Sequence, residues 1–129
     1  VLGILDETIE LTAGNGGMKL GLAISYGGRA EIVDATRRIA VSVRDGEIDP
    51  EALDEETFRR FLYHPEIPDP DLMIRTAGEM RVSNFLLWQV SYAELHVEEV
   101  CWPDFRKEHL HAAFRTFGRR VRKFGAVLP

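Results

Sequence analysis

The sequence has one cysteine, no long hydrophobic run and no excess of positive charge, and each of these absences excludes a class of protein. Cys101 cannot form a disulfide within the chain, which excludes a disulfide-stapled secreted domain and favours a reducing compartment. A membrane-spanning helix needs about 18 or more apolar residues, and the longest candidate run, 85–90, is interrupted by Gln89. A net charge of −5 fits nucleic acid binding poorly, and no cleavable signal is visible at the start.

The composition is typical of one globular domain, with 45% hydrophobic and 29% charged residues in a chain of 129. Helical periodicity alternates with short apolar runs, which predicts an α/β fold with a parallel sheet flanked by helices. We expect three strands, at 19–26, 72–76 and 96–102. We expect helices over 1–13, from about 30 to 44, after the cap Asp54, over 85–95 and over 110–124, the last with Gly118 in its interior.

The start of the chain has an unusual pattern. Val1, Leu2, Leu5 and Ile9 share one helical face, yet no capping residue precedes them. Two explanations fit this pattern equally well. The 129 residues are the C-terminal portion of a larger domain, or they are a domain whose first helix has a ragged end.

Two segments follow predicted strands, where ligands bind in open α/β sheets. The first is Tyr26-Gly27-Gly28-Arg29, in which two glycines lead into a helix whose free N–H groups could receive an anion. A simple tight turn explains this segment more economically. We keep Arg29 as a further candidate for a substrate site.

The second segment places two arginines and a hydroxyl within nine residues. Arg75 ends a strand, Arg81 lies in the loop, and Ser83 stands where it could cap the next helix. Guanidinium groups match phosphate oxygens with paired donors, so this group is a candidate cradle for a diphosphate. The alternative, equally weighted, is that the arginines pair with Asp71 and Glu79 and that the serine only caps.

Glu94 follows on the same predicted helix, about three turns after Ser83. A carboxylate that faces a diphosphate needs a bridging cation such as Mg²⁺, although a surface glutamate is an equal alternative. No His or Cys pattern indicates zinc, and His109 and His111 are interpreted as surface residues. The basic residues at 115–123 are explained best as a surface that matches the helix dipole, and less well as a site for an anion or a partner.

Several motifs together resemble the cis-prenyltransferase family, most closely its bacterial undecaprenyl diphosphate synthase branch. They are DPDLMIRTAGEMRVSNFLLWQ at 69–89, YAEL at 92–95 and WPDF at 102–105. The resemblance extends back through SYGGRAEIV at 25–33 and forward to 119–120 and 124–125, so it covers nearly the whole chain.

The resemblance implies that isopentenyl diphosphate is condensed repeatedly with an allylic diphosphate such as farnesyl diphosphate, which gives a Z-polyprenyl diphosphate. It further implies that Arg75, Arg81 and Ser83 bind isopentenyl diphosphate and that Glu94 helps bind Mg²⁺. Residues 1–129 would be the C-terminal portion of one catalytic domain, with the catalytic aspartate outside this chain. The 129 residues alone would then be inactive.

Other properties of the family are implied in the same way. They are a homodimer, whose contact lies near residues 85–102, and a cytoplasmic location with loose membrane contact through the product. Two departures from the family pattern are Met80, where some members carry a metal-contacting histidine, and Lys123, where arginine is usual. The alternative function is a non-catalytic subunit that contributes diphosphate-binding arginines to a partner.

Overall fold

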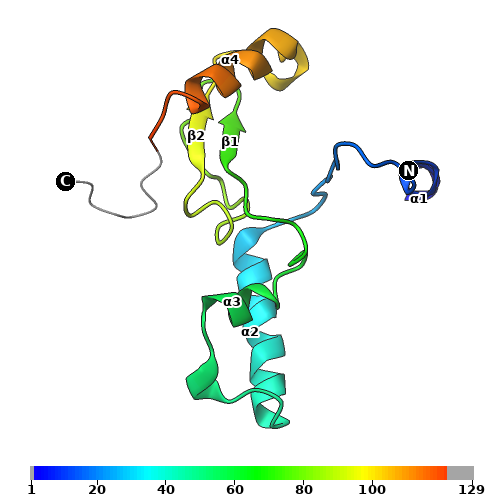
Figure 1. Cartoon of the computed structure of the whole chain (residues 1–129), viewed down its shortest axis with the longest axis vertical. Coiled ribbons are helices and arrows are strands. Elements are labelled where there is room, and N and C mark those ends of the chain that lie inside the picture. Colours follow the sequence, from blue (N-terminus) through cyan, green and yellow to red (C-terminus); the bar gives the residue numbers. More distant parts are fainter. Residues whose placement is uncertain (1, 122–129) are drawn as a thin grey trace.

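The computed structural model describes residues 2–121, except for the side chain of residue 2. Its helices are α1 (Leu2–Thr12), α2 (Gly28–Arg44), α3 (Glu55–Arg59) and α4 (Lys107–Phe117), with short 3₁₀ turns η1 (Pro50–Ala52) and η2 (Trp102–Asp104). The strands are β1 (Leu72–Arg75) and β2 (Glu94–Val97) (Figure 1). The predicted α/β class with a parallel sheet and helices is confirmed.

Helix α2 forms the long lower arm of the molecule (Figure 1). Ala35 and Ile39, one helical turn apart, are buried and supply its inner face. The helix ends where the sequence predicts, because Gly46 takes a left-handed φ of 77° just after the cap residue Asp45.

The chain returns along α2 through η1 and α3. The predicted cap of α3 is confirmed, since the Asp54 carboxylate accepts a hydrogen bond of 2.8 Å from the backbone N–H of Thr57. Tyr63 links this returning segment to α2, because its hydroxyl donates a hydrogen bond to the Asp34 carboxylate at 2.6 Å. Leu62 is buried and completes the small apolar core of this arm.

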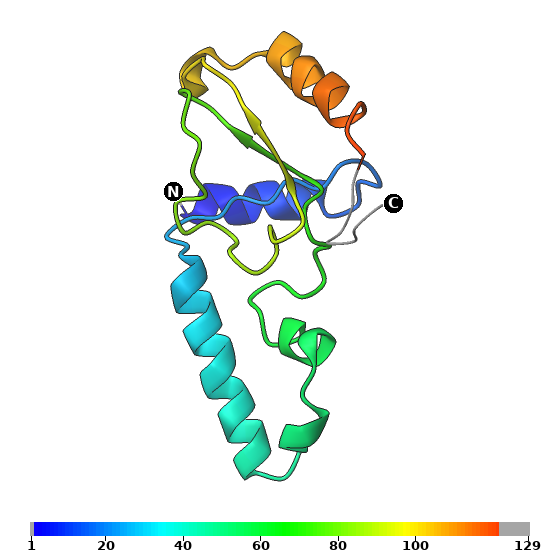
Figure 2. The ribbon, with the colours of Figure 1, turned by 90° about the vertical axis from the view of Figure 1, so that its left-hand side faces the viewer.

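The sheet stands above α2 (Figure 2). Strands β1 and β2 are parallel, with Leu72 opposite Glu94 and Arg75 opposite Val97. Helix α4 packs against β2 and buries Ala113. Parallel strands place their carboxyl ends at one edge, so the loops after β1 and β2 meet there.

The predicted strand at 19–26 is wrong. The segment is extended but joins no ladder within the described residues, and Leu20, Leu22 and Ile24 are each more than 60% exposed. An apolar run makes a segment suitable for a buried strand, yet a strand also needs a neighbour to bond to. The described part of the sheet therefore has two strands, where three were expected.

One predicted helix is wrong, and the bounds of one strand and one helix need correction. The helix expected over 85–95 is a series of turns, and β2 begins at Glu94 and ends at Val97, where 96–102 was expected. Helix α4 ends at Phe117, so Gly118 is its C-cap and lies outside its interior; Val121 lies beyond it, and Phe124 is outside the described residues. No helix in the described part of the chain is long and apolar enough to cross a membrane.

Candidate functional site

The carboxyl end of β1 brings two of the predicted site residues together. Arg75, the last residue of the strand, pairs with one carboxylate oxygen of Glu79, and Arg81 contacts the other oxygen at 2.5 Å. The pairing with Glu79 that the alternative interpretation expects is therefore present. It also shows that both guanidinium groups converge on one small acceptor.

The charges of these three side chains do not cancel, because two guanidinium groups face one carboxylate. Hydrogen bonding from Arg81, followed by the charges of both arginines, lowers the pKa of Glu79, so it is ionised at neutral pH. Arg75 is one-quarter exposed and its Nε is buried without a hydrogen-bond partner in the described structure. These three side chains together thus carry one net positive charge, and the Arg75 Nε is a buried N–H donor without an acceptor in residues 2–121.

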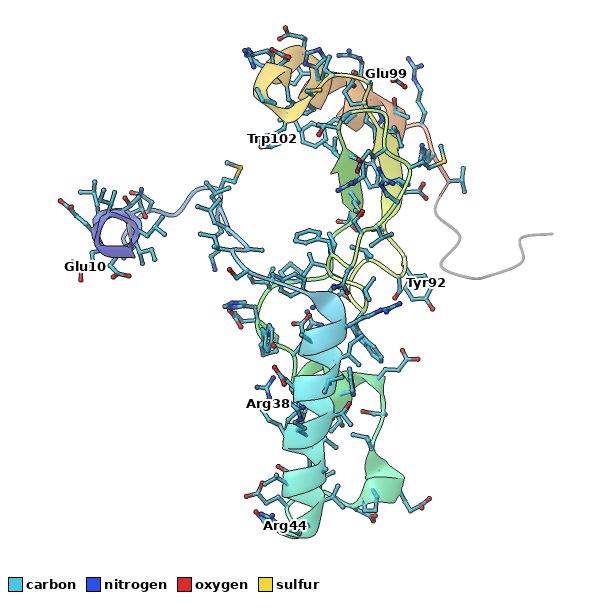
Figure 3. All side chains as sticks on the ribbon, turned by 180° about the vertical axis from the view of Figure 1, so that it is seen from behind. Glu10, Arg38, Arg44, Tyr92, Glu99 and Trp102 are labelled. Carbon is cyan, nitrogen blue, oxygen red and sulfur yellow. The ribbon has the colours of Figure 1, made fainter. Side chains whose placement is uncertain are left out.

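The loop that carries Glu79 is fixed by the exit of β2. The N–H groups of Ala77 and Gly78 donate to the carbonyl oxygens of Val100 and Glu98 at 2.8 and 3.0 Å. Gly78 has a φ of 64°, and a Cβ there would lie 2.9 Å from a carboxylate oxygen of Glu99. Figure 3 shows Glu99 at the end of the molecule opposite Arg44 of α2, so this edge of the sheet lies far from the tip of the arm.

One apolar cavity reaches this edge along β1, and a second lies near the amino end of β1. A cavity of about 370 Å³ is lined by Arg75 together with the following residues: Pro70, Leu72, Met73, Ile74, Phe85, Leu86 and Val90. A larger cavity of about 980 Å³ lies between the extended segment 19–26 and the loop 63–70, and Phe85 and Leu86 contribute to both. Apolar volume next to a cationic group can hold a ligand with a charged head and a hydrocarbon body.

Ser83 does not cap a helix, contrary to the prediction. Its φ is 52°, its side chain is exposed, and its hydroxyl forms no hydrogen bond to either arginine in the described structure. The next residue, Asn84, does cap a helix, but that helix is α2. Its carbonyl and side-chain oxygens accept the N–H groups of Gly28 and Arg29 at 2.8 and 2.9 Å.

This capping contradicts the anion-binding interpretation of the segment Tyr26-Gly27-Gly28-Arg29. The two helix-start amides expected to be free for an anion are bonded to Asn84, while the Arg29 side chain is exposed. Sequence reasoning missed Asn84, since it lies 55 residues from its partner. The pair Gly27-Gly28 was the available signal, because it indicates that another backbone approaches closely.

Glu94 does not lie with the arginines. It opens β2 opposite Leu72, about 10 Å along the strand from the end that Arg75 occupies. Its carboxylate accepts a hydrogen bond of 2.6 Å from Arg120. Residues 2–121 contain no group of three His, Cys, Asp or Glu side chains that could hold a metal ion, so Glu94 does not complete a magnesium site by itself.

A buried carboxylate in the first turn of α2 was also missed. Glu31 is 2% exposed and accepts hydrogen bonds from the Tyr26 hydroxyl, the Tyr63 N–H at 2.9 Å and the Gln89 amide at 3.1 Å. Burial and the bond to Glu31 raise the pKa of Tyr26 far above its ordinary value. An acid in the first helical turn is ordinarily explained by the helix dipole, so no sequence signal pointed to this network.

The chain matches a family model described as "putative undecaprenyl diphosphate synthase" over residues 1–125. An isoprenyl transferase of Chlorobaculum tepidum is 50% identical over 121 residues, which cover 94% of this chain and 46% of the relative. A trans,polycis-polyprenyl diphosphate synthase ((2Z,6E)-farnesyl diphosphate specific) of Thermobifida fusca is 47% identical over 97% of this chain and 44% of its own length.

Solved structures agree with these relatives. The lavandulyl diphosphate synthase of Lavandula x intermedia, in complex with dimethylallyl diphosphate, superposes with a TM-score of 0.87 at 38% identity, over 97% of this chain and 54% of its own. A probable undecaprenyl diphosphate synthase of Campylobacter jejuni superposes with a TM-score of 0.76 at 36% identity, over 95% and 54%. The chain spans about half the length of the relatives it matches.

Proposed function

This chain belongs to the undecaprenyl diphosphate synthase family of cis-prenyltransferases, and on that premise we propose that it acts in cis-prenyl transfer. In this reaction the alkene of isopentenyl diphosphate bonds to the allylic carbon of a substrate such as farnesyl diphosphate, the carbon–oxygen bond to the allylic diphosphate breaks, and a proton is lost from the isopentenyl unit. Residues 1–129 would form the C-terminal portion of one catalytic domain. The catalytic aspartate would lie in a part of the protein outside this sequence.

Within this function, Arg75, Arg81 and Ser83 bind the diphosphate of isopentenyl diphosphate. The observation that carries the assignment is the convergence of both guanidinium groups on the two oxygens of Glu79. A diphosphate presents the same kind of acceptor with more negative charge, so it would displace this carboxylate. Ser83, two residues after Arg81, would add a neutral donor, and the exposed Arg29 remains a candidate for the same substrate site.

The hydrocarbon part of the substrate needs a different environment from its diphosphate. The apolar cavity beside Arg75 supports this assignment, because a prenyl group can enter it while its charged end stays with the arginines. Holding the donor alkene in one orientation raises its effective concentration at the reacting carbon. The residues of this chain would therefore contribute binding and positioning.

Magnesium, a homodimer and a cytoplasmic location with loose membrane contact belong to the same proposal. Mg²⁺ would neutralise the leaving diphosphate, and Glu94 is its candidate ligand in this chain. That role requires further ligands from outside the described residues and the release of Glu94 from Arg120.

The test uses Arg81→Ala in the complete protein. We expect the KM for isopentenyl diphosphate to rise by about tenfold or more and turnover to fall, because a charge-assisted contact to the substrate is lost. The matched control is Arg37→Ala, which removes an exposed arginine that pairs with Asp34 at 2.9 Å on α2. Unchanged kinetics in the Arg81 variant would remove the assignment. Incorporation of labelled isopentenyl diphosphate only when a partner is added would favour the non-catalytic subunit instead.

A further inference from the structure

The segment just after Arg81 has an unusual backbone. Ser83, Asn84 and Leu86 have φ values of 52°, 62° and 48°, in the left-handed region. Asparagine tolerates this region, whereas serine and leucine adopt it rarely. Such a conformation persists only where the surrounding structure holds it, and it often accompanies ligand sites.

Asn84 supplies this support from the centre of the segment. It uses its carbonyl and its side-chain oxygen on two successive amides, those of Gly28 and Arg29. The residue that precedes α2, Gly27, has no side chain to cap the helix. Asn84 therefore caps α2 from a distant part of the sequence, and the same bonds that satisfy the helix fix the segment.

The backbone of α2 at Gly28 and the backbone of residues 84–87 are too close to admit a side chain between them. A Cβ on Gly28 would lie 2.9 Å from the Leu87 side chain and 3.2 Å from the Asn84 carbonyl oxygen. A second attachment follows five residues after Asn84, where Gln89 donates to the buried Glu31. The first turn of α2 thus holds the segment at two points, on either side of the cavity-lining residues Phe85 and Leu86.

We propose that Asn84 is a positioning residue for the diphosphate site, and this inference rests on the proposed function. By capping α2 it fixes the backbone that joins Arg81 to the cavity wall, and with it the place of the Ser83 hydroxyl. Loss of the cap leaves the arginines intact but lets this backbone move. Binding of isopentenyl diphosphate weakens, while chemistry on bound substrate continues.

Asn84→Gly isolates the side-chain bond in the complete protein, because glycine accepts the left-handed backbone without strain. We expect the KM for isopentenyl diphosphate to rise about three- to tenfold, as for the loss of one hydrogen bond, with kcat and the KM of the allylic substrate within twofold. Asn84→Asp keeps the acceptor and should restore most of the affinity. The control is Asp49→Gly, which removes the acceptor for the Glu51 N–H at the start of η1, and its kinetics should match the wild type.

Three results would overturn the inference. Unchanged kinetics in Asn84→Gly, with a raised KM in Arg81→Ala, would refute the role of Asn84 and leave the proposed function standing. Unchanged kinetics in Arg81→Ala would remove the proposed function and the inference with it. An equal loss of kcat, of both affinities and of thermal stability in Asn84→Gly, without rescue by aspartate, would assign Asn84 a structural role alone.

Discussion

Replacing Glu31 with alanine should destabilise the protein severely, because this buried carboxylate serves three donors from three parts of the chain. The donors are the Tyr26 hydroxyl, the Tyr63 N–H and the Gln89 amide. Each buried donor left without an acceptor costs about 1–3 kcal/mol, and removing the carboxylate recovers part of its own desolvation cost. We expect a net loss of about 3 kcal/mol in the free energy of unfolding.

The isosteric variant Glu31→Gln should cost far less, about 1 kcal/mol. One oxygen remains to accept the Tyr63 N–H, and the new amide group needs an acceptor. Gln89 offers one, because its Oε1 is buried without a hydrogen-bond partner among the described residues. A rotation of the Gln89 amide would direct this oxygen towards the new donor.

Thermal unfolding of the complete protein separates these cases. At about 2–4 °C per kcal/mol, Glu31→Ala should lower Tm by about 6–12 °C and Glu31→Gln by about 2–4 °C. The control is Glu47→Ala, since Glu47 is exposed near the end of α2 and accepts one bond of 2.9 Å from Ser42. If Glu31→Ala unfolds at the temperature of the Glu47 control, the network does not stabilise the fold and the reasoning fails.

Three further predictions test the site by independent measurements. Gly28→Ala should lower the unfolding free energy by about 1–3 kcal/mol in chemical denaturation, because its Cβ meets Leu87; an unchanged midpoint would contradict the close approach. Tyr26 should ionise well above pH 10 in an ultraviolet titration, and stability that its neutral phenol provides should be lost as the pH rises beyond 10; ionisation near 10 would contradict its burial. The Glu79 carboxyl should titrate below its ordinary range in ¹³C NMR, with the stability from its ion pairs lost only as the pH falls through that lowered pKa, and Arg81→Ala should raise it; no change would deny the contact.

Local signals predicted the parts of the fold that depend on neighbours in the sequence. Asp54 begins α3 and Gly46 follows the end of α2, since a cap or a left-handed glycine acts within one turn of chain. The gathering of Arg75 and Arg81 was also predictable, because the end of a parallel strand and its loop share one edge of the sheet. Pairing with Glu79 was anticipated as the alternative, and the structure shows both features in one cluster.

The failures lie where distant segments decide the backbone. Residues 85–90 are an apolar run that was expected to open a helix, yet Asn84, which contacts α2, and Leu86 have left-handed angles that a helix does not contain. Because the expected helix does not form, Glu94 does not share a helix with Ser83 and is instead the first residue of β2. No local pattern predicts that Glu31 is buried, since its hydrogen-bond partners lie up to 58 residues away.

The exposed segment from Met18 to Ile24, unpaired within the described part of the sheet, affects how the protein must be handled. Its alternate apolar side chains are 64–92% exposed on an extended backbone, which is a template to which other chains adhere. Preparations of these 129 residues alone should therefore aggregate at high concentration. Titrations of isolated material would then report self-association, which makes the complete protein the proper material for kinetics.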